Sequence, residues 1–114
     1  MTTVAIVQGA YYVVTGLWAI VHIESFQKVT GPKTDIWLVK TVGLLLAVIG
    51  AALLLAAYRQ QFDPALMLVA MGSAAALMAI ELVYVAKRTI SRVYLLDAVV
   101  EAGLITWWAV TLPF

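Results

Sequence analysis

Four long apolar runs dominate the sequence, and their length restricts the fold more than any other feature. They extend approximately over residues 4–23, 36–58, 64–86 and 90–112. Each run reaches the roughly 20 residues that an α-helix needs to cross the hydrocarbon core of a bilayer. Because 65% of the residues are hydrophobic and only 11% are charged, the composition excludes a water-soluble domain of this size. The chain is therefore predicted to be an all-α, polytopic membrane protein.

The connections between these runs are short and carry signals for helix ends and helix starts. A glycine-proline turn follows the first run, and Thr34 is the expected N-cap of the second helix. Asp63 followed by Pro64 is a typical start for the third helix. Since connections of this length place neighbouring helices antiparallel, we predict one domain, residues 1–114, folded as a single antiparallel four-helix bundle.

The positions of the basic residues predict how this bundle is oriented in a membrane. The second connection carries only Arg59, whereas the other two are rich in lysine and arginine. The positive-inside rule then places these two basic connections in the cytoplasm and both termini outside, in a multi-pass protein of the plasma (inner) membrane. Lys28 and Lys33 in the first connection could hold an anionic lipid head group there. The scattered basic residues and the net charge of +1 give no nucleic-acid-binding surface.

Five acidic or basic residues of the apolar runs are expected to be buried, and all five fall in the predicted cytoplasmic half. These residues are His22 at the end of the first run, Lys40 early in the second, Glu81 late in the third, and Asp97 and Glu101 early in the fourth. A charged side chain that faces lipid at the centre of a helix costs roughly 2.5–3.5 kcal/mol. We therefore expect these side chains to face the interior of the bundle or a water-filled cavity.

Helical periodicity places the polar and aromatic residues of each run on one face of its helix. On the second helix this face contains Trp37, Lys40 and Tyr58, and on the fourth it contains Asp97 and Glu101. We expect the four faces to enclose a polar chamber that is open toward the cytoplasm. The side chains expected to contact a substrate in this chamber are those of Tyr11, Thr15, Trp18, Trp37, Tyr84, Arg88, Tyr94 and Trp108.

The cluster of acids predicts proton chemistry. Lys40 is the only deep cation for three carboxyls, so it cannot neutralise all of them. Asp97 and Glu101 are one helical turn apart, where like charges repel, and burial also disfavours ionisation. At least one of these carboxyls is therefore expected to be protonated at neutral pH. A protonated acid close to an ionised one is typical of general acid-base sites and of proton-coupled transporters.

The favoured hypothesis is an intramembrane isomerase or hydrolase that acts by acid-base chemistry on a lipophilic small molecule. Glu101 or Asp97 would donate the proton and the other acid would serve as the base. Glu81 and Lys40 would adjust their proton affinities, and His22 would orient the substrate or a water molecule. The alternatives are a proton-coupled small-molecule transporter and an accessory subunit of a larger membrane complex, in which the acids bind neighbouring helices.

The same residues also have purely structural interpretations. Asp97 and Glu101 could clamp neighbouring helices, and Lys40 could extend its amine to the membrane surface. Glu81 could pair with a basic residue at the end of its own helix, and His22 could lie at the interface.

No metal or other cofactor is expected, and the partners expected are membrane lipid, a lipophilic small molecule and a second copy of the chain. Di-iron bundles use Glu-x-x-His pairs, and neither Glu81 nor Glu101 has a histidine three residues later. Gly72 and Ala76 form a small-xxx-small pair, which favours close helix packing or homo-oligomerisation. The size and four-helix layout are similar to those of small multidrug-resistance transporters, although the first helix here has no central acid.

Overall fold

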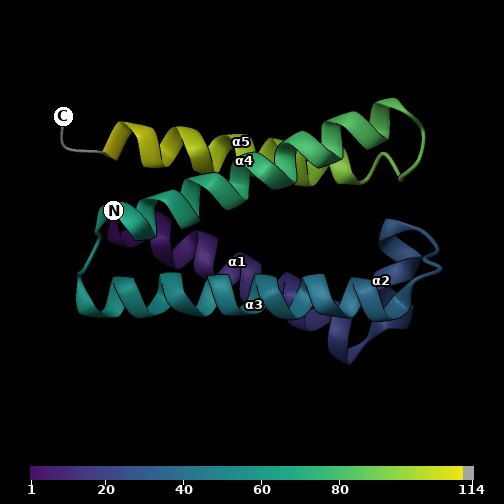
Figure 1. Cartoon of the computed structure of the whole chain (residues 1–114), viewed down its shortest axis with the longest axis horizontal. Helices are drawn as coiled ribbons and strands as arrows, with labels where there is room; N and C mark the ends of the chain where they lie inside the picture. The colour runs from purple at the N-terminus through teal and green to yellow at the C-terminus, as the bar shows by residue number, and fades with distance from the viewer. Residues whose placement is uncertain (112–114) are drawn as a thin grey trace. The chain divides into compact units, whose positions relative to one another are not determined.

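The computed structural model describes residues 1–111, and within this range the chain is helical and contains no strand (Figure 1). The helices are α1 (Thr2–Val21), α2 (Ile23–Thr30), α3 (Ile36–Arg59), α4 (Pro64–Ala86) and α5 (Tyr94–Thr111). By length and composition, α1, α3, α4 and α5 could each cross a membrane. The predicted all-α class and the four candidate membrane spans are therefore confirmed. The predicted end of the last helix, residue 112, lies outside the described residues.

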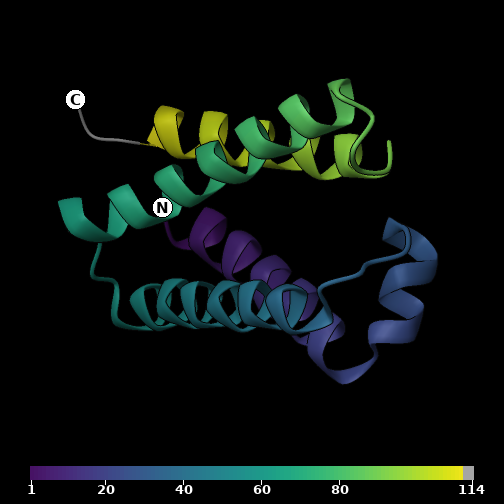
Figure 2. The same ribbon diagram turned by 45° about the vertical axis from the view of Figure 1, so that its right-hand side comes forward.

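α2 is the helix that the sequence did not predict. The first helix was expected to continue to residue 23, but α1 ends at Val21 and the chain changes direction at His22, where φ is −139°. Figure 2 shows α2 turned away from the direction of α1. Its sequence, IESFQKVT, mixes polar and apolar residues, so it does not stand out as a separate apolar run. The helix is therefore short and amphipathic, and it follows the first candidate membrane span directly.

The connection between α4 and α5 is longer than predicted, because α5 begins at Tyr94 rather than at residue 90. Arg88 adopts a left-handed conformation with φ of 60°. The backbone N–H groups of Thr89 and Ile90 both donate to the carbonyl oxygen of Tyr84, at 2.9 and 3.4 Å. These hydrogen bonds end α4 and fold the following residues into a loop, so Ile90 does not start the last helix.

The described chain forms two helical units. Residues 2–61 contain α1, α2 and α3, and the chain from residue 62 onward contains α4 and α5. The packing of these two units into a single four-helix bundle stays a prediction.

Glycine residues bring α1 and α3 into backbone contact. A Cβ atom on Gly50 would lie 2.6 Å from the carbonyl oxygen of Gly9, and a Cβ atom on Gly43 would lie 2.7 Å from that of Gly16. The order of the two pairs is reversed between the helices, so α1 and α3 run antiparallel. Seven residues are about two helical turns, so the two glycines of each helix share one face. Glycine is required here because any side chain would push the two backbones apart.

Within the described residues, Gly72 and Ala76, the small-xxx-small pair predicted to support close packing, do not lie at a backbone contact like that between α1 and α3. A Cβ atom on Gly72 would contact Leu68 of the same helix at 3.8 Å, an ordinary van der Waals distance, and Ala76 is exposed. The close helix contact of this chain therefore comes from the glycines of α1 and α3. A role for Gly72 and Ala76 in homo-oligomerisation stays a prediction.

The start of α4 depends on a side-chain cap. Asp63 Oδ1 accepts a hydrogen bond from the backbone N–H of Leu66 at 2.8 Å, and Pro64 occupies the first helical position. We expect Asp63→Ala to lower the free energy of unfolding by about 0.5–2 kcal/mol, because the first turn of α4 then loses this acceptor. Thermal unfolding in detergent micelles, followed by circular dichroism, measures the change.

The matched control for this substitution is Asp35→Ala. Asp35 is the N-cap of α3, one residue after the predicted Thr34, but its side chain makes no capping hydrogen bond. A loss of stability in Asp35→Ala equal to that in Asp63→Ala would contradict the capping explanation.

Candidate functional site

The buried residues of α4 and α5 separate into an acidic end and an apolar end. Glu81 lies in the last third of α4, and Asp97 and Glu101 lie in the first half of α5. Farther from these acids, the buried residues are all apolar. They are Ala70 and Ala74 of α4 and Leu104 and Trp108 of α5. The helices of this pair therefore hold acidic groups at one end of their buried faces only.

The three acids within α4 and α5 lie together. The side chains of Glu81 and Asp97 are hydrogen-bonded to each other, and Glu101 is close enough to Glu81 for an electrostatic interaction. Glu101 is fully buried and Glu81 is 6% exposed, whereas Asp97 is partly exposed. The structure thus brings together the three carboxyls of the predicted site. Their catalytic roles stay predictions.

The hydrogen bond between Glu81 and Asp97 has a chemical consequence. An ionised carboxylate can only accept hydrogen bonds, so one of the two groups must carry a proton that the other accepts. The pair can therefore share a proton between α4 and α5. Within residues 1–111, no three His, Asp or Glu side chains are placed to hold a metal ion.

Tyr84, Lys87 and Arg88 follow Glu81 at the end of α4 and in the loop after it. The Lys87 Nζ atom lies 5.7 Å from the centre of the Tyr84 ring, a cation-π geometry. Arg88 is exposed in the loop, and Tyr94 is partly buried at the first position of α5. Lys87, a basic residue at the end of α4, therefore contacts an aromatic ring.

Trp108 lies at the apolar end of α5. Its ring is fully buried and meets the ring of Phe62 at 6.2 Å in an edge-to-face arrangement. Two helical turns separate Trp108 from Glu101 along α5. Trp108 therefore packs the apolar end of this unit, and its predicted contact with a substrate stays a prediction.

In the other unit, the face of α3 that meets α1 differs from the predicted polar face. The contact is made through Gly43 and Gly50, whereas Lys40 is exposed and Trp37 and Tyr58 are 70% and 87% exposed. The sequence could not identify the packed face, because in a membrane protein both the packed and the lipid-facing sides of a helix are apolar. Exposure of Lys40 agrees with the structural interpretation in which its amine extends to the membrane surface. Its role as counter-charge to the acids stays a prediction.

His22 and Trp18 take part in a local network that holds the start of α2. His22 Nδ1 accepts the Ser25 N–H at 3.3 Å and lies 2.7 Å from Ser25 Oγ. The Trp18 indole N–H donates to the same Oγ atom at 2.8 Å, and its ring packs edge-to-face on Phe26 at 5.3 Å. This network explains why the chain turns at His22. Sequence reasoning missed Ser25, although a polar residue followed three positions later by serine is a helix-capping pattern.

The two remaining predicted residues, Tyr11 and Thr15, lie on α1. Thr15 Oγ1 donates to the backbone carbonyl of Tyr11, the usual way in which a threonine inside a helix satisfies its hydroxyl. The Tyr11 ring lies 6.2 Å from that of Tyr12. Contacts of these two residues with a substrate stay predictions.

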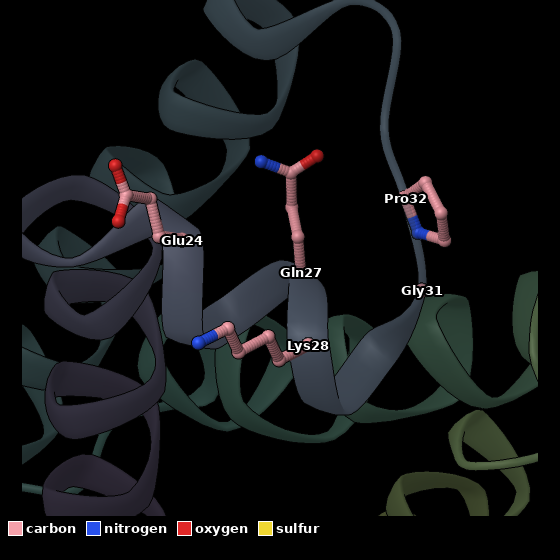
Figure 3. A pocket seen from close by; sticks show the side chains of 5 residues that line it. All are labelled: Glu24, Gln27, Lys28, Gly31 and Pro32. Atoms are coloured by element: carbon pink, nitrogen blue, oxygen red, sulfur yellow. The ribbon is translucent and has the colours of Figure 1, made fainter.

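A hollow in the surface lies at the end of α2 (Figure 3). Its lining residues are Glu24, Gln27, Lys28, Gly31 and Pro32. None of them belongs to the acid-base site predicted from the sequence.

Comparisons of the chain with known protein families, with characterised proteins and with solved structures find no match.

Proposed function

We propose that this protein is a membrane-embedded acid-base enzyme, an isomerase or hydrolase, that acts on a lipophilic small molecule. The observation that supports this proposal is the hydrogen bond between Glu81 and Asp97, with the buried Glu101 beside it. A proton held between two carboxyls, next to a third, supplies both the acid and the base that such a reaction needs. Four helices that could cross a membrane supply the lipid setting in which a lipophilic substrate dissolves.

Within this proposal, the proton resides on Glu81 and the negative charge on Asp97. Asp97 is partly exposed and lies in the first turn of α5, where the helix dipole stabilises an anion. Glu81 is almost fully buried inside α4, where a charge is more costly. Asp97 then exchanges protons with water, and Glu81 holds the proton that the substrate receives. Glu101, one turn beyond Asp97 and fully buried, is the second proton acceptor.

An isomerisation at this site needs no oxidant, reductant or other reactant. The Asp97 carboxylate removes a proton from one atom of the substrate, and the protonated Glu81 returns a proton to another atom. The substrate therefore changes its bonding while its overall composition stays the same. In the hydrolase variant, the carboxylate instead removes a proton from an attacking water molecule, and the acid protonates the leaving group.

One feature of α4 and α5 favours the enzyme over the proton-coupled transporter. A transporter must pass protons to both sides of the membrane, whereas the acids occupy only one end of the buried faces of these helices. The other end is formed by Ala70, Ala74, Leu104 and Trp108, none of which carries an acid or a base. Proton exchange from one side is sufficient for a membrane enzyme. The plasma membrane location and the outside position of both termini are part of this proposal.

The proposal is tested on the full chain, extracted gently in detergent. Native mass spectrometry combined with organic extraction identifies a lipophilic compound that co-purifies with the protein. The protein is then incubated with that compound in deuterated buffer, and acid-base chemistry is expected to place deuterium in the compound or to convert it. A specific compound that the protein neither labels nor converts would contradict the enzyme, and purification only with partner subunits would favour the accessory-subunit alternative.

A further inference from the structure

An open hollow in the surface at the end of α2 is lined mainly by polar and charged side chains. It is formed by Glu24, Gln27 and Lys28 of α2 and by Gly31 and Pro32 of the following turn (Figure 3). Its volume is about 610 Å³, which falls within the range of roughly 300–1,000 Å³ that is usual for ligand pockets. The side chains of Glu24 and Gln27 extend from the same side of the helix, and Pro32 stands opposite them.

Hydrogen bonds hold the turn beside α2 in place. Gly31 has a φ of 102°, which glycine adopts without strain, and its N–H donates to the Gln27 carbonyl oxygen at 2.8 Å. The Lys33 N–H donates to Gln27 Oε1 at 2.9 Å, and Lys33 Nζ donates to the Thr30 carbonyl oxygen at 3.2 Å. The hollow is therefore formed by the fold of the chain before any ligand binds.

The polar groups of the hollow are complementary to a zwitterion. Because Gln27 Oε1 accepts from Lys33, the NH₂ group of Gln27 is left to donate to a ligand. Lys28 adds an ammonium group and Glu24 adds a carboxylate. Both are exposed, and neither forms a hydrogen bond or an ion pair with the described part of the chain, residues 1–111. The hollow thus offers donors for an anion and, one turn away, an acceptor for a cation.

The hollow adjoins the ends of two helices that could cross a membrane. α2 connects α1 and α3, which are both candidate membrane spans, at the ends where α1 finishes and α3 begins. Trp18 and Trp37 lie at these same two ends, and tryptophan is enriched at the level of lipid head groups. A lipid whose tails lie beside α1 and α3 therefore has its head group beside α2.

We propose that this hollow binds the head group of a zwitterionic phospholipid with a primary amine, phosphatidylethanolamine. Lys28 and the Gln27 NH₂ group hold the phosphate, and Glu24 accepts hydrogen bonds from the ammonium group. Phosphatidylglycerol has the same phosphate but no ammonium group to pair with the Glu24 carboxylate. A choline head group has no N–H to donate to Glu24.

The test measures the lipids retained by the full chain in native mass spectrometry, after incubation with equal amounts of phosphatidylethanolamine, phosphatidylcholine and phosphatidylglycerol. We expect the protein to retain at least about ten times more of the ethanolamine lipid than of either other lipid. A tenfold preference corresponds to the free energy of one charge-assisted hydrogen bond. Glu24→Gln should abolish the preference for the ethanolamine lipid over the choline lipid. Lys28→Gln should reduce the retention of all three lipids. Both residues are exposed, so neither variant should change the circular dichroism spectrum.

The control and the competitors make the outcome decisive. Arg59→Gln removes an exposed cation at the other end of α3 and should leave lipid retention unchanged. Soluble glycerophosphoethanolamine should compete with the lipid, and inorganic phosphate should not. Equal retention of choline and ethanolamine lipids, preference for phosphatidylglycerol, displacement by inorganic phosphate alone, or an effect of Arg59→Gln equal to that of Lys28→Gln would each overturn the proposal.

Discussion

Gly16→Ala is expected to destabilise the protein by about 1–3 kcal/mol or more, although it adds only one methyl group. The new Cβ atom would overlap the Gly43 carbonyl oxygen and lie 2.9 Å from the backbone nitrogen of Ala47. Both are backbone atoms, so no side-chain rotation relieves the contact and α1 must move away from α3. Chemical or thermal unfolding in detergent micelles, followed by circular dichroism, measures the loss.

The same substitution at Gly103 is the matched control. A Cβ atom there would have no atom within 4 Å in the described structure. Alanine is favoured over glycine inside a helix by roughly 0.5–1 kcal/mol, so Gly103→Ala should be neutral or stabilising. Gly9→Ala should lie between the two, because part of its contact is with the movable side chain of Leu54. Equal stability of the Gly16 and Gly103 variants would show that α1 and α3 do not meet through their glycines.

Loss of a carboxyl from the acidic cluster is expected to have the largest effect on activity. In the deuterium-exchange assay described above, Asp97→Asn and Glu101→Gln should each lower the rate by a factor of roughly 10²–10⁴, the usual contribution of a general acid or base. Asp35→Asn makes the same chemical change as Asp97→Asn at an exposed position whose side chain makes no capping bond, and it should retain full activity.

Folding must be separated from chemistry in these variants. Both replacements are close in size to the residues they replace, and amides can still donate and accept hydrogen bonds. We therefore expect the unfolding temperature of Asp97→Asn to stay near that of the unmodified protein. Full activity of both cluster variants would remove the acid-base assignment, whereas a loss of activity in Asp35→Asn as well would show that the assay does not report on this site.

The sequence predicted the long helices well because their signals are strong. The observed bounds of α4, Pro64–Ala86, match the prediction, since Asp63 and Pro64 mark its start so clearly. α2 was missed because an eight-residue amphipathic helix resembles a polar connection, and its capping network of His22 and Ser25 depends on local geometry.

The packed faces of the helices were predictable only where polar residues identify them. On α5, Asp97 and Glu101 placed the inward face correctly, because burying acids beside one another requires neighbouring protein. On α3, Trp37 and Lys40 indicated a face that the structure leaves exposed, and the true contact runs through Gly43 and Gly50. Glycine has no side chain to produce a periodic signal, so a hydropathy pattern cannot show that two backbones touch.

Infrared spectroscopy of the full chain in lipid nanodiscs tests whether α4 and α5 hold a proton between carboxyl groups. At neutral pH the protein should show the C=O stretching band of a protonated carboxyl, and this band should shift in deuterated buffer. Glu81→Gln should remove it, whereas Asp35→Asn should leave it unchanged. A spectrum without a protonated carboxyl at neutral pH, or a band that persists in Glu81→Gln with Asp97→Asn combined, would contradict the account.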